Sequence, residues 1–210
     1  MRQNPVFSLD DADEIRALVE ANPWVTMVST TESGLVASHY PVIVDRERDD
    51  LSLLSHVGRP DEEVHGLGSS ELLLIVQGAH GYISPGWYDA NPAVPTWNFT
   101  TAHLYGVPEL LSAEENLRVL AELVDRFEER MPEPRRMNAD PANAEYAARI
   151  SAGTVGFRLT PTRAIGKRKL SQNRPEATVD RIITELEGTG PYASPALAAD
   201  MRRARDSPFS

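Results

Sequence analysis

The sequence predicts a mostly β protein with peripheral helices, an α+β fold built around an antiparallel β-barrel. Two observations support this prediction. Five segments rich in β-branched and aromatic residues follow one another between residues 24 and 111, with short turns between them. A parallel sheet would need a crossover helix between successive strands, and no such helix fits into these turns.

The first elements are a helix and a hairpin. Residues 10–21 place Ile15, Leu18 and Val19 at helical spacing, and acidic residues crowd the first turn, where the helix dipole favours them. Asn22-Pro23 ends this helix. Residues 24–30 and 35–44 then read as two strands joined by the turn-like sequence TESG, which predicts a hairpin.

Three further strands complete the predicted barrel. They cover residues 51–57, 71–84 and 95–111, and the second of them is expected to break near Gly78. Residues 59–68 between the first two strands form a helical turn or a loop.

A capped helix is expected over residues 112–130. Ser112 and Glu115 form a capping box at its start. Its apolar stripe consists of Leu117, Leu120, Leu123, Val124 and Phe127. Shorter elements follow: a helix over 142–150, strands over 153–160 and 163–170, and a helix over 176–187.

These elements form a single expected domain over residues 1–187. It carries helical insertions within 112–150 and a C-terminal strand and helix segment. The Gly-, Pro- and Ala-rich residues 188–210 are expected to form a flexible tail.

The composition restricts the class of protein. The chain has 210 residues, of which 41% are hydrophobic, so it can bury one sizeable core. A formal net charge of −10 and a pI near 5.0 argue against a broad basic surface for nucleic acid. Cysteine is absent, which excludes disulfides and thiolate chemistry. The N-terminus lacks a signal-peptide apolar region, and the longest aliphatic run, LLLIV, is too short to cross a membrane. We therefore expect a cytoplasmic protein.

No catalytic template matches the chain. The sequence contains no G-x-S-x-G elbow, no P-loop and no G-x-G-x-x-G fingerprint. The histidines form no H-x-x-x-H pair, so no metal site is predicted. His39 and His103 lie within strands and read as structural histidines. The catalytic residues remain unassigned.

An aromatic segment at residues 82–99, YISPGWYDANPAVPTWNF, is the first candidate for binding. Tyr82, Trp87 and Trp97 can stack on a planar heterocycle, and Asn98 can offer a donor and an acceptor to its edge. A packed aromatic corner or a dimer interface explains the composition equally well.

A strand that gives way to a turn is the second candidate, at residues 53–62. His56 and Arg59 can contact an anion there, together with the N–H groups of a starting helix. Taken alone, the segment favours another interpretation, in which an exposed Arg59 pairs with Asp61 or Glu62.

The stretch IGKRKLSQNR, residues 165–174, contains four cations and no acid in an acidic chain. On a strand, Lys167 and Lys169 share one face. Lys169 and the following Ser171, Gln172 and Asn173 reach a pocket together if the strand ends at its mouth. A basic edge strand that prevents aggregation is the alternative.

Four segments together resemble the PaiB-like family of FMN-binding negative transcriptional regulators. They are HVGRP, GYISPGWY, VPTWNFTTAHLYG and GKRKLSQNR, and the resemblance covers about residues 1–190. It implies the FMN-binding split-barrel fold, an FMN cofactor and a homodimer with the flavin at the subunit interface. It assigns the phosphate to His56, Arg59 and Lys169, the ring to Trp97, Asn98, Gln172 and Asn173, and the wall between them to Tyr82 and Ser84.

Three functions follow as hypotheses. The first is a homodimeric FMN-binding protein with a flavin-dependent redox or regulatory role, in which the redox role is that of a weak FMN-dependent oxidoreductase. The second is a repressor that binds DNA directly, which the acidic helix 112–130 and the lack of a helix-turn-helix disfavour. The third is a haem or deazaflavin in the same barrel, with His39, His56 or His103 available to a haem. No membrane partner is expected.

Overall fold

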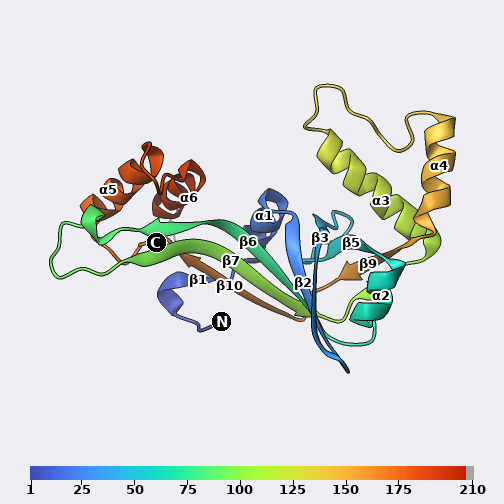
Figure 1. The fold of residues 1–210 in the computed structure, drawn as a ribbon, viewed down its shortest axis with the longest axis horizontal. Helices are drawn as coiled ribbons and strands as arrows, with labels where there is room; N and C mark the ends of the chain where they lie inside the picture. Colours follow the sequence, from blue (N-terminus) through green and yellow to red (C-terminus); the bar gives the residue numbers. More distant parts are fainter. Residues whose placement is uncertain (207–210) are drawn as a thin grey trace. The chain divides into compact units, whose positions relative to one another are not determined.

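The computed structural model describes residues 1–206, and these residues form an α+β fold of two antiparallel sheets (Figure 1). This confirms the predicted fold class. The first sheet has the order β1-β10-β7-β6-β2-β3. Its strands are β1 (Ser8–Leu9), β10 (Arg163–Lys169), β7 (Thr96–Gly106), β6 (Leu72–Ile83), β2 (Trp24–Thr31) and β3 (Gly34–Pro41). The second sheet has the order β4-β5-β9-β8, with β4 (Ile43–Val44), β5 (Leu53–Gly58), β9 (Thr154–Leu159) and β8 (Glu109–Leu110).

The first four helices lie in the connections between these strands, and the last two follow β10. They are α1 (Ala12–Ala21), α2 (Arg59–His65), α3 (Ala113–Glu128), α4 (Pro141–Ser151), α5 (Glu176–Glu187) and α6 (Pro195–Asp206), with short 3₁₀ turns η1 (Pro5–Phe7) and η2 (Pro85–Trp87). Among residues 1–206, no helix is both long enough and apolar enough to cross a membrane.

The chain divides into two compact units that interleave in the sequence. Unit 1 consists of residues 1–11 and 77–102 and the described part of 165–210. Unit 2 consists of residues 12–76 and 103–164. The bounds expected for a single domain, 1–187, stay a prediction.

The hairpin of unit 2 forms as the sequence predicts, but its second strand ends early. β2 and β3 pair from Trp24↔Pro41 to Thr31↔Gly34. Gly34 has φ +112°, a conformation that a residue without a Cβ adopts readily in a tight turn. The predicted strand 35–44 is divided after Pro41, because Ile43 and Val44 leave β3 and pair with β5.

α3 begins at the predicted capping box. The Ser112 N–H donates to Glu115 Oε2 over 2.9 Å, and the Glu115 N–H donates to Ser112 Oγ over 3.2 Å. The buried side of α3 differs from the predicted stripe, however, since it consists of Asn116, Val119 and Leu123, whereas Phe127 is 39% exposed. Val119 and Leu123 pack with Ile43, Leu54 and Leu111 in a core of unit 2.

The packing of α3 on β9 explains the shift of its buried side. Asn116 Nδ2 donates to Thr154 Oγ1 over 3.0 Å. A Cβ built on Gly156 would lie 2.9 Å from Asn116 Oδ1, so the helix approaches the strand where the strand has no side chain. A polar residue therefore forms part of the buried face of α3, and a search for apolar spacing does not detect it.

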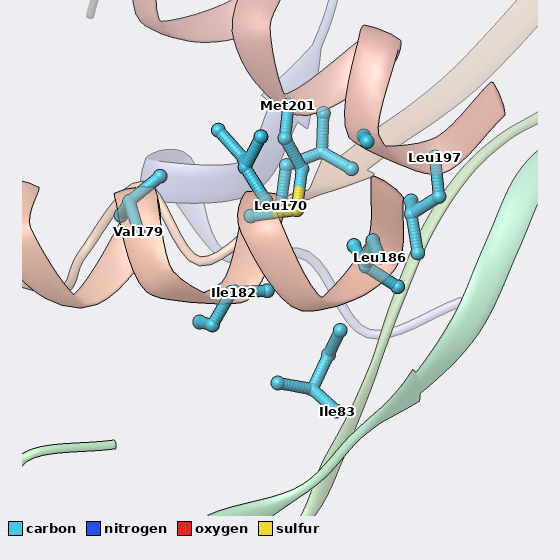
Figure 2. Packing of buried hydrophobic residues seen from close by; sticks show 9 residues of the cluster. Ile83, Leu170, Val179, Ile182, Leu186, Leu197 and Met201 are labelled. Carbon is cyan, nitrogen blue, oxygen red and sulfur yellow. The ribbon is translucent and has the colours of Figure 1, made fainter. Parts of the chain in front are cut away.

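The core of unit 1 lies beneath α5 and α6 (Figures 1 and 2). Ile83 from β6 and Leu170, the residue that follows β10, pack with residues of both helices. The helical residues are Val179, Ile182, Ile183, Leu186, Leu197, Ala198 and Met201. This core fixes the turn at residues 170–174 that follows β10.

Two expectations for unit 1 are wrong. The expected break of the strand near Gly78 does not occur, because β6 runs without interruption through a buried Gly78. The expected tail 188–210 is also not frayed over 195–206, where α6 forms and buries Leu197 and Met201. The part of that expectation that concerns residues 207–210 lies outside the described residues.

Candidate functional site

Lys169 lies at the end of β10 and reaches the start of β7. Its ammonium donates to Thr96 Oγ1 and, over 3.0 Å, to the carbonyl oxygen of Trp97. Burial lowers the pKa of Lys169, and the positive charges of Lys167 and Arg174 lower it further. Three cations therefore lie close enough to repel one another in the basic stretch, which is the arrangement that an anionic ligand would stabilise.

An aromatic group surrounds Trp97 in the same unit. The Trp97 side chain is 56% exposed, with the His80 ring stacked at 6.4 Å and the Tyr82 ring edge-on at 6.3 Å between centroids. Tyr82 also contacts Tyr192 at 4.8 Å between centroids. The structure thus brings together the predicted cation Lys169 and the predicted stacking residues Trp97 and Tyr82.

Asn98 is fully buried and supports the turn after β10. Its Nδ2 donates to Ser171 Oγ over 2.9 Å, and the Ser171 hydroxyl donates back to Asn98 Oδ1 over 3.2 Å. Ser171 has φ +63°, a left-handed conformation that costs a residue with a Cβ about 1–2 kcal/mol. The Asn98 amide therefore holds a strained residue in place, and its predicted contact with a ring edge stays a prediction.

Gln172 supports the same turn through the main chain. Its Oε1 accepts from the Leu170 N–H over 2.7 Å, and its Nε2 donates to the carbonyl oxygens of Arg168 and Val6 over 2.6 and 3.2 Å. Asn173, the next residue, is exposed. Of these two predicted ring contacts, Asn173 is the more accessible to a ligand.

Ser84 caps the turn η2. Its Oγ accepts from the Gly86 N–H over 3.1 Å, which orders the Pro-Gly-Trp turn that follows Tyr82 along the chain. The predicted role of Ser84 in the wall of the site therefore coincides with a structural role.

His56 and Arg59, the other two predicted phosphate contacts, lie in unit 2. His56 is on β5, its Nδ1 is buried without a hydrogen-bond partner among residues 1–206, and burial lowers its pKa. Arg59 begins α2, where its Nε donates to the Ala152 carbonyl oxygen over 2.7 Å and its Nη1 pairs with Glu62 at 3.3 Å. The pairing of Arg59 with Glu62 is the alternative that the sequence offered.

Sequence reasoning missed His80, Thr96 and Tyr192 as members of this site. The Thr96 hydroxyl accepts a hydrogen bond from Lys169. The Tyr192 ring contacts the ring of Tyr82, and the His80 ring stacks on Trp97. His80 lies two residues before Tyr82 on β6, so the alternation of side chains along a strand could have placed it on the same face. Tyr192 lies in a loop far along the chain, and no local pattern indicates it.

Among residues 1–206, no group of three or more His, Cys, Asp or Glu side chains lies in an arrangement that could hold a metal ion. The arrangement in unit 1 is instead suited to a ligand with an anionic group and a flat ring.

Comparisons with known proteins give the family. The model of the family described as "Putative FMN-binding domain" matches residues 1–163, so the chain belongs to this family. The Bacillus subtilis (strain 168) protein named "Protease synthase and sporulation protein PAI 2" is 28% identical over 182 residues, which cover 86% of each chain. The resemblance to PaiB-like proteins is therefore confirmed.

Solved structures show the same fold. The flavocytochrome Anf3 from Azotobacter vinelandii matches with a TM-score of 0.59 at 16% identity, over 80% of this chain and 72% of that one. The FAD and heme binding protein from Mycobacterium smegmatis matches with a TM-score of 0.58 at 16% identity, over 88% and 81%. The fold is thus the split-barrel type found in flavin-binding proteins, as the resemblance implied.

Proposed function

We propose that the protein binds FMN as a homodimer and that the flavin serves a redox or regulatory role. The observation that carries the proposal is the crowded cation Lys169, bonded to the main-chain carbonyl oxygen of Trp97, a residue with an exposed ring, in a chain that belongs to an FMN-binding family. FMN joins a phosphate to a flat ring system, and the site offers a partner for each.

The phosphate is assigned to Lys169. Two of its three ammonium protons have acceptors among the described residues, which leaves one for a phosphate oxygen. A charge-assisted hydrogen bond contributes about 1.5–3 kcal/mol. A bound phosphate would also offset the repulsion from Lys167 and Arg174 that lowers the pKa of Lys169. His56 and Arg59 lie in unit 2, and their predicted contacts with the phosphate stay a prediction.

The ring is assigned to Trp97 and Tyr82. Their edge-on arrangement leaves more than half of the Trp97 side chain exposed to a ligand, and a stacked pair contributes about 0.5–1.5 kcal/mol beyond the burial of area. Asn173 is proposed to contact the ring edge. Asn98 and Gln172 are proposed to act through the turn that they hold, because their amides bond to the chain.

The flavin, when bound, supplies the electron chemistry, and this chain binds and orients it. The residues described above offer no group placed as a general acid or base for a substrate. The proposed activity is accordingly that of a weak FMN-dependent oxidoreductase, with its substrate unassigned.

A comparison of FMN with riboflavin tests the assignment of the phosphate. Riboflavin lacks the phosphate, so the native protein is expected to bind FMN about 10–100-fold more tightly, from one or two charge-assisted bonds. Lys169→Gln should weaken the binding of FMN by a similar factor and leave the affinity for riboflavin unchanged. Arg163→Gln removes the same charge from the start of the same strand, where Arg163 faces Glu71 at 3.7 Å, and should change neither. Fluorescence titration measures all six affinities, those of the two ligands for the native protein and for each variant.

The same titration distinguishes a failure of the phosphate assignment from a failure of the flavin proposal. If Lys169→Gln loses affinity for FMN and for riboflavin by the same factor, Lys169 does not contact the phosphate. If FMN produces no change in fluorescence or visible absorbance with the native protein, the flavin proposal itself fails. A Soret band on titration with haem, which FMN does not suppress, would favour the haem alternative instead.

A regulatory role without redox chemistry is the second candidate, and the relationship to PAI 2 favours it, because the name of that protein connects it with protease synthesis and sporulation. Direct binding to DNA would depend on the basic stretch, since α3 carries acidic residues in its first turn. A gel shift with the promoter of its own gene at two salt concentrations tests this role. Binding that salt does not weaken would contradict an electrostatic contact with DNA.

A further inference from the structure

A cavity of about 320 Å³ lies in unit 1 between the turn after β10, the start of α5 and the end of α6. This volume is at the lower end of the range of about 300–1,000 Å³ that is typical of small-molecule sites. The cavity borders the core described above, since Leu170, Val179 and Met201, which Figure 2 labels among the core residues, also line the cavity.

The inner wall of the cavity is apolar. Leu170, Val179 and Met201 line it and are otherwise buried, and Ala204 lines it one turn further along α6. The Met201 thioether is flexible and polarisable, so it adapts to a flat or branched apolar group. The apolar part of a ligand would therefore contact side chains from the end of β10, α5 and α6 at once.

Charged side chains line the rim of the cavity, and Arg174 is the one proposed to bind a negative charge. Arg174 lies at the rim, and its guanidinium is 5.0 Å from the centre of the Tyr88 ring, which orients it. Arg205 also lies at the rim, but its charge is matched by Asp180 at 2.6 Å. Glu176 adds one negative charge to the same rim, so a dianion would meet repulsion that a monoanion largely avoids.

We propose that this cavity binds an amphipathic monoanion, a molecule with a compact apolar body and one carboxylate, sulfonate or phosphodiester group. The apolar body packs on Leu170, Val179 and Met201, and the anionic group bonds to Arg174. Because an ion pair at a rim is partly solvated, most of the affinity comes from the apolar wall, and Arg174 selects the sign of the charge.

The lining of the cavity differs from the set of residues proposed for the flavin, although the two are neighbours: Asn98 Nδ2 donates to the Met201 sulfur over 3.6 Å, and the charge of Arg174 acts on Lys169. Of the nine residues predicted to contact FMN, Gln172 alone lines the cavity, and its side-chain amide is bonded to three main-chain groups. Gln172 therefore forms part of the wall and leaves ligand recognition to Arg174. The proposal goes beyond flavin binding and does not depend on it.

The test uses 8-anilinonaphthalene-1-sulfonate, which has two aromatic groups and one sulfonate, as the probe. Isothermal titration calorimetry of the full chain should give one probe molecule per chain with a Kd in the micromolar range. Ala204→Trp should fill the cavity and remove this binding. Arg174→Gln should weaken it about 5–10-fold, somewhat less than the loss of a fully buried charge-assisted bond.

Two control variants match these changes outside the cavity. Ala193→Trp adds the same ring at an exposed loop position, and Arg181→Gln removes an arginine from the exposed side of α5, where it pairs with Asp89 at 3.3 Å. Both should bind the probe as the native chain does. Circular dichroism of each variant checks that it is folded, and Arg174→Gln keeps the test valid if Ala204→Trp does not fold.

The titration is repeated in the presence of saturating FMN. Unchanged binding of the probe supports a separate site, whereas competition by FMN would overturn the proposal and make the cavity part of the flavin site. Probe binding that survives both Ala204→Trp and Arg174→Gln would also overturn it. If the native chain binds the probe at one site but does not bind FMN at all, the flavin proposal fails and the cavity proposal stands.

Discussion

At the scale of single residues, the fold restricts the chemistry of the His65 imidazole. It is 1% exposed, and its Nδ1 and Nε2 lie 2.8 and 2.9 Å from the hydroxyls of Ser29 and Ser38. Burial lowers the pKa of His65, although the negative charge of Asp61 opposes this shift. A neutral imidazole suits the site, because it donates to one serine and accepts from the other.

This environment predicts a loss of stability in mild acid. In the unfolded chain a histidine has a pKa of about 6.5, so below that pH the unfolded state binds a proton that folded His65 resists. The free energy of unfolding should therefore be constant above about pH 6.5 and fall below it, by at most about 1.4 kcal/mol per pH unit for each such histidine. Urea unfolding at pH 7.5 and pH 5.5 measures the loss.

His65→Gln should reduce the difference between the free energies of unfolding at pH 7.5 and pH 5.5, even though it also lowers the free energy of unfolding at pH 7.5. Part of the difference should remain, because burial lowers the pKa of His56 and His103 in the same direction. His80→Gln changes an exposed strand position and should keep the full difference. A His65→Gln variant with the same pH dependence as the native chain would contradict this account.

Gly166 shows how closely two strands approach. It pairs with Leu9 between β10 and β1, and a Cβ built on it would lie 2.1 Å from the Leu9 carbonyl oxygen. Because the obstacle is backbone, Gly166→Ala should push β1 away from β10 and lower the free energy of unfolding by about 1–3 kcal/mol. Gly190→Ala is the matched control, since a Cβ there meets nothing within 4 Å. Equal urea midpoints for the two variants would show that the β1–β10 contact contributes nothing.

At the scale of secondary-structure elements, α6 closes the core of unit 1. Leu197 is fully buried, and a Cβ built on Gly81 of β6 would lie 3.0 Å from its Cδ2, so the helix packs directly on the strand. Leu197→Ala should destabilise the protein by about 2–5 kcal/mol, from lost burial and a residual cavity. Leu35→Ala, the same change at a 78% exposed position of β3, should cost less than about 0.5 kcal/mol. Thermal unfolding of both variants checks this contrast.

The same helix shows what sequence patterns can and cannot predict. Most elements were predictable: the capping box located the start of α3, and α5 begins and ends at the predicted residues 176 and 187. α6 was missed because its sequence is rich in alanine and arginine and follows a Gly- and Pro-rich segment. A signal was present, since Ser194 precedes Pro195 and Leu197 and Met201 are spaced by four residues.

The errors within predicted elements have a physical cause in tertiary contacts. A glycine in a strand reads as a break, yet Gly78 is buried inside β6, where hydrogen bonding between strands needs no side chain. The buried face of α3 contains Asn116, whose partner Thr154 lies 38 residues away in the sequence. Local periodicity carries no information about such a partner.

The candidate site was predictable to a similar extent. The aromatic segment and the basic stretch each indicated a binding role, and the structure joins them through the hydrogen bond from Lys169 to the Trp97 carbonyl oxygen. The buried position of Asn98 and the ring contact between Tyr82 and Tyr192 depend on the fold and have no local signature.

At the scale of the whole molecule, the proposed homodimer and the proposed flavin are coupled. If FMN lies at the subunit interface, as the family resemblance implies, it binds the dimer more tightly than the monomer. Thermodynamic linkage then requires FMN to favour dimerisation by the same factor. Chains with a formal charge of −10 repel one another, so the measurement belongs at about 150 mM salt, where the Debye length is about 8 Å.

Sedimentation velocity over a dilution series tests this coupling. At high concentration the native protein should sediment as a dimer with twice the 23.2 kDa mass of the chain, and it should dissociate on dilution. Saturating FMN should lower the concentration of half-dissociation about 10-fold or more, which corresponds to a coupling of about 1.4 kcal/mol. Lys169→Gln should keep the flavin-free dissociation constant and lose the effect of FMN, because its change concerns the phosphate contact alone. A monomer that binds one FMN per chain, or a dimer whose dissociation FMN does not alter, would place the flavin within a single subunit.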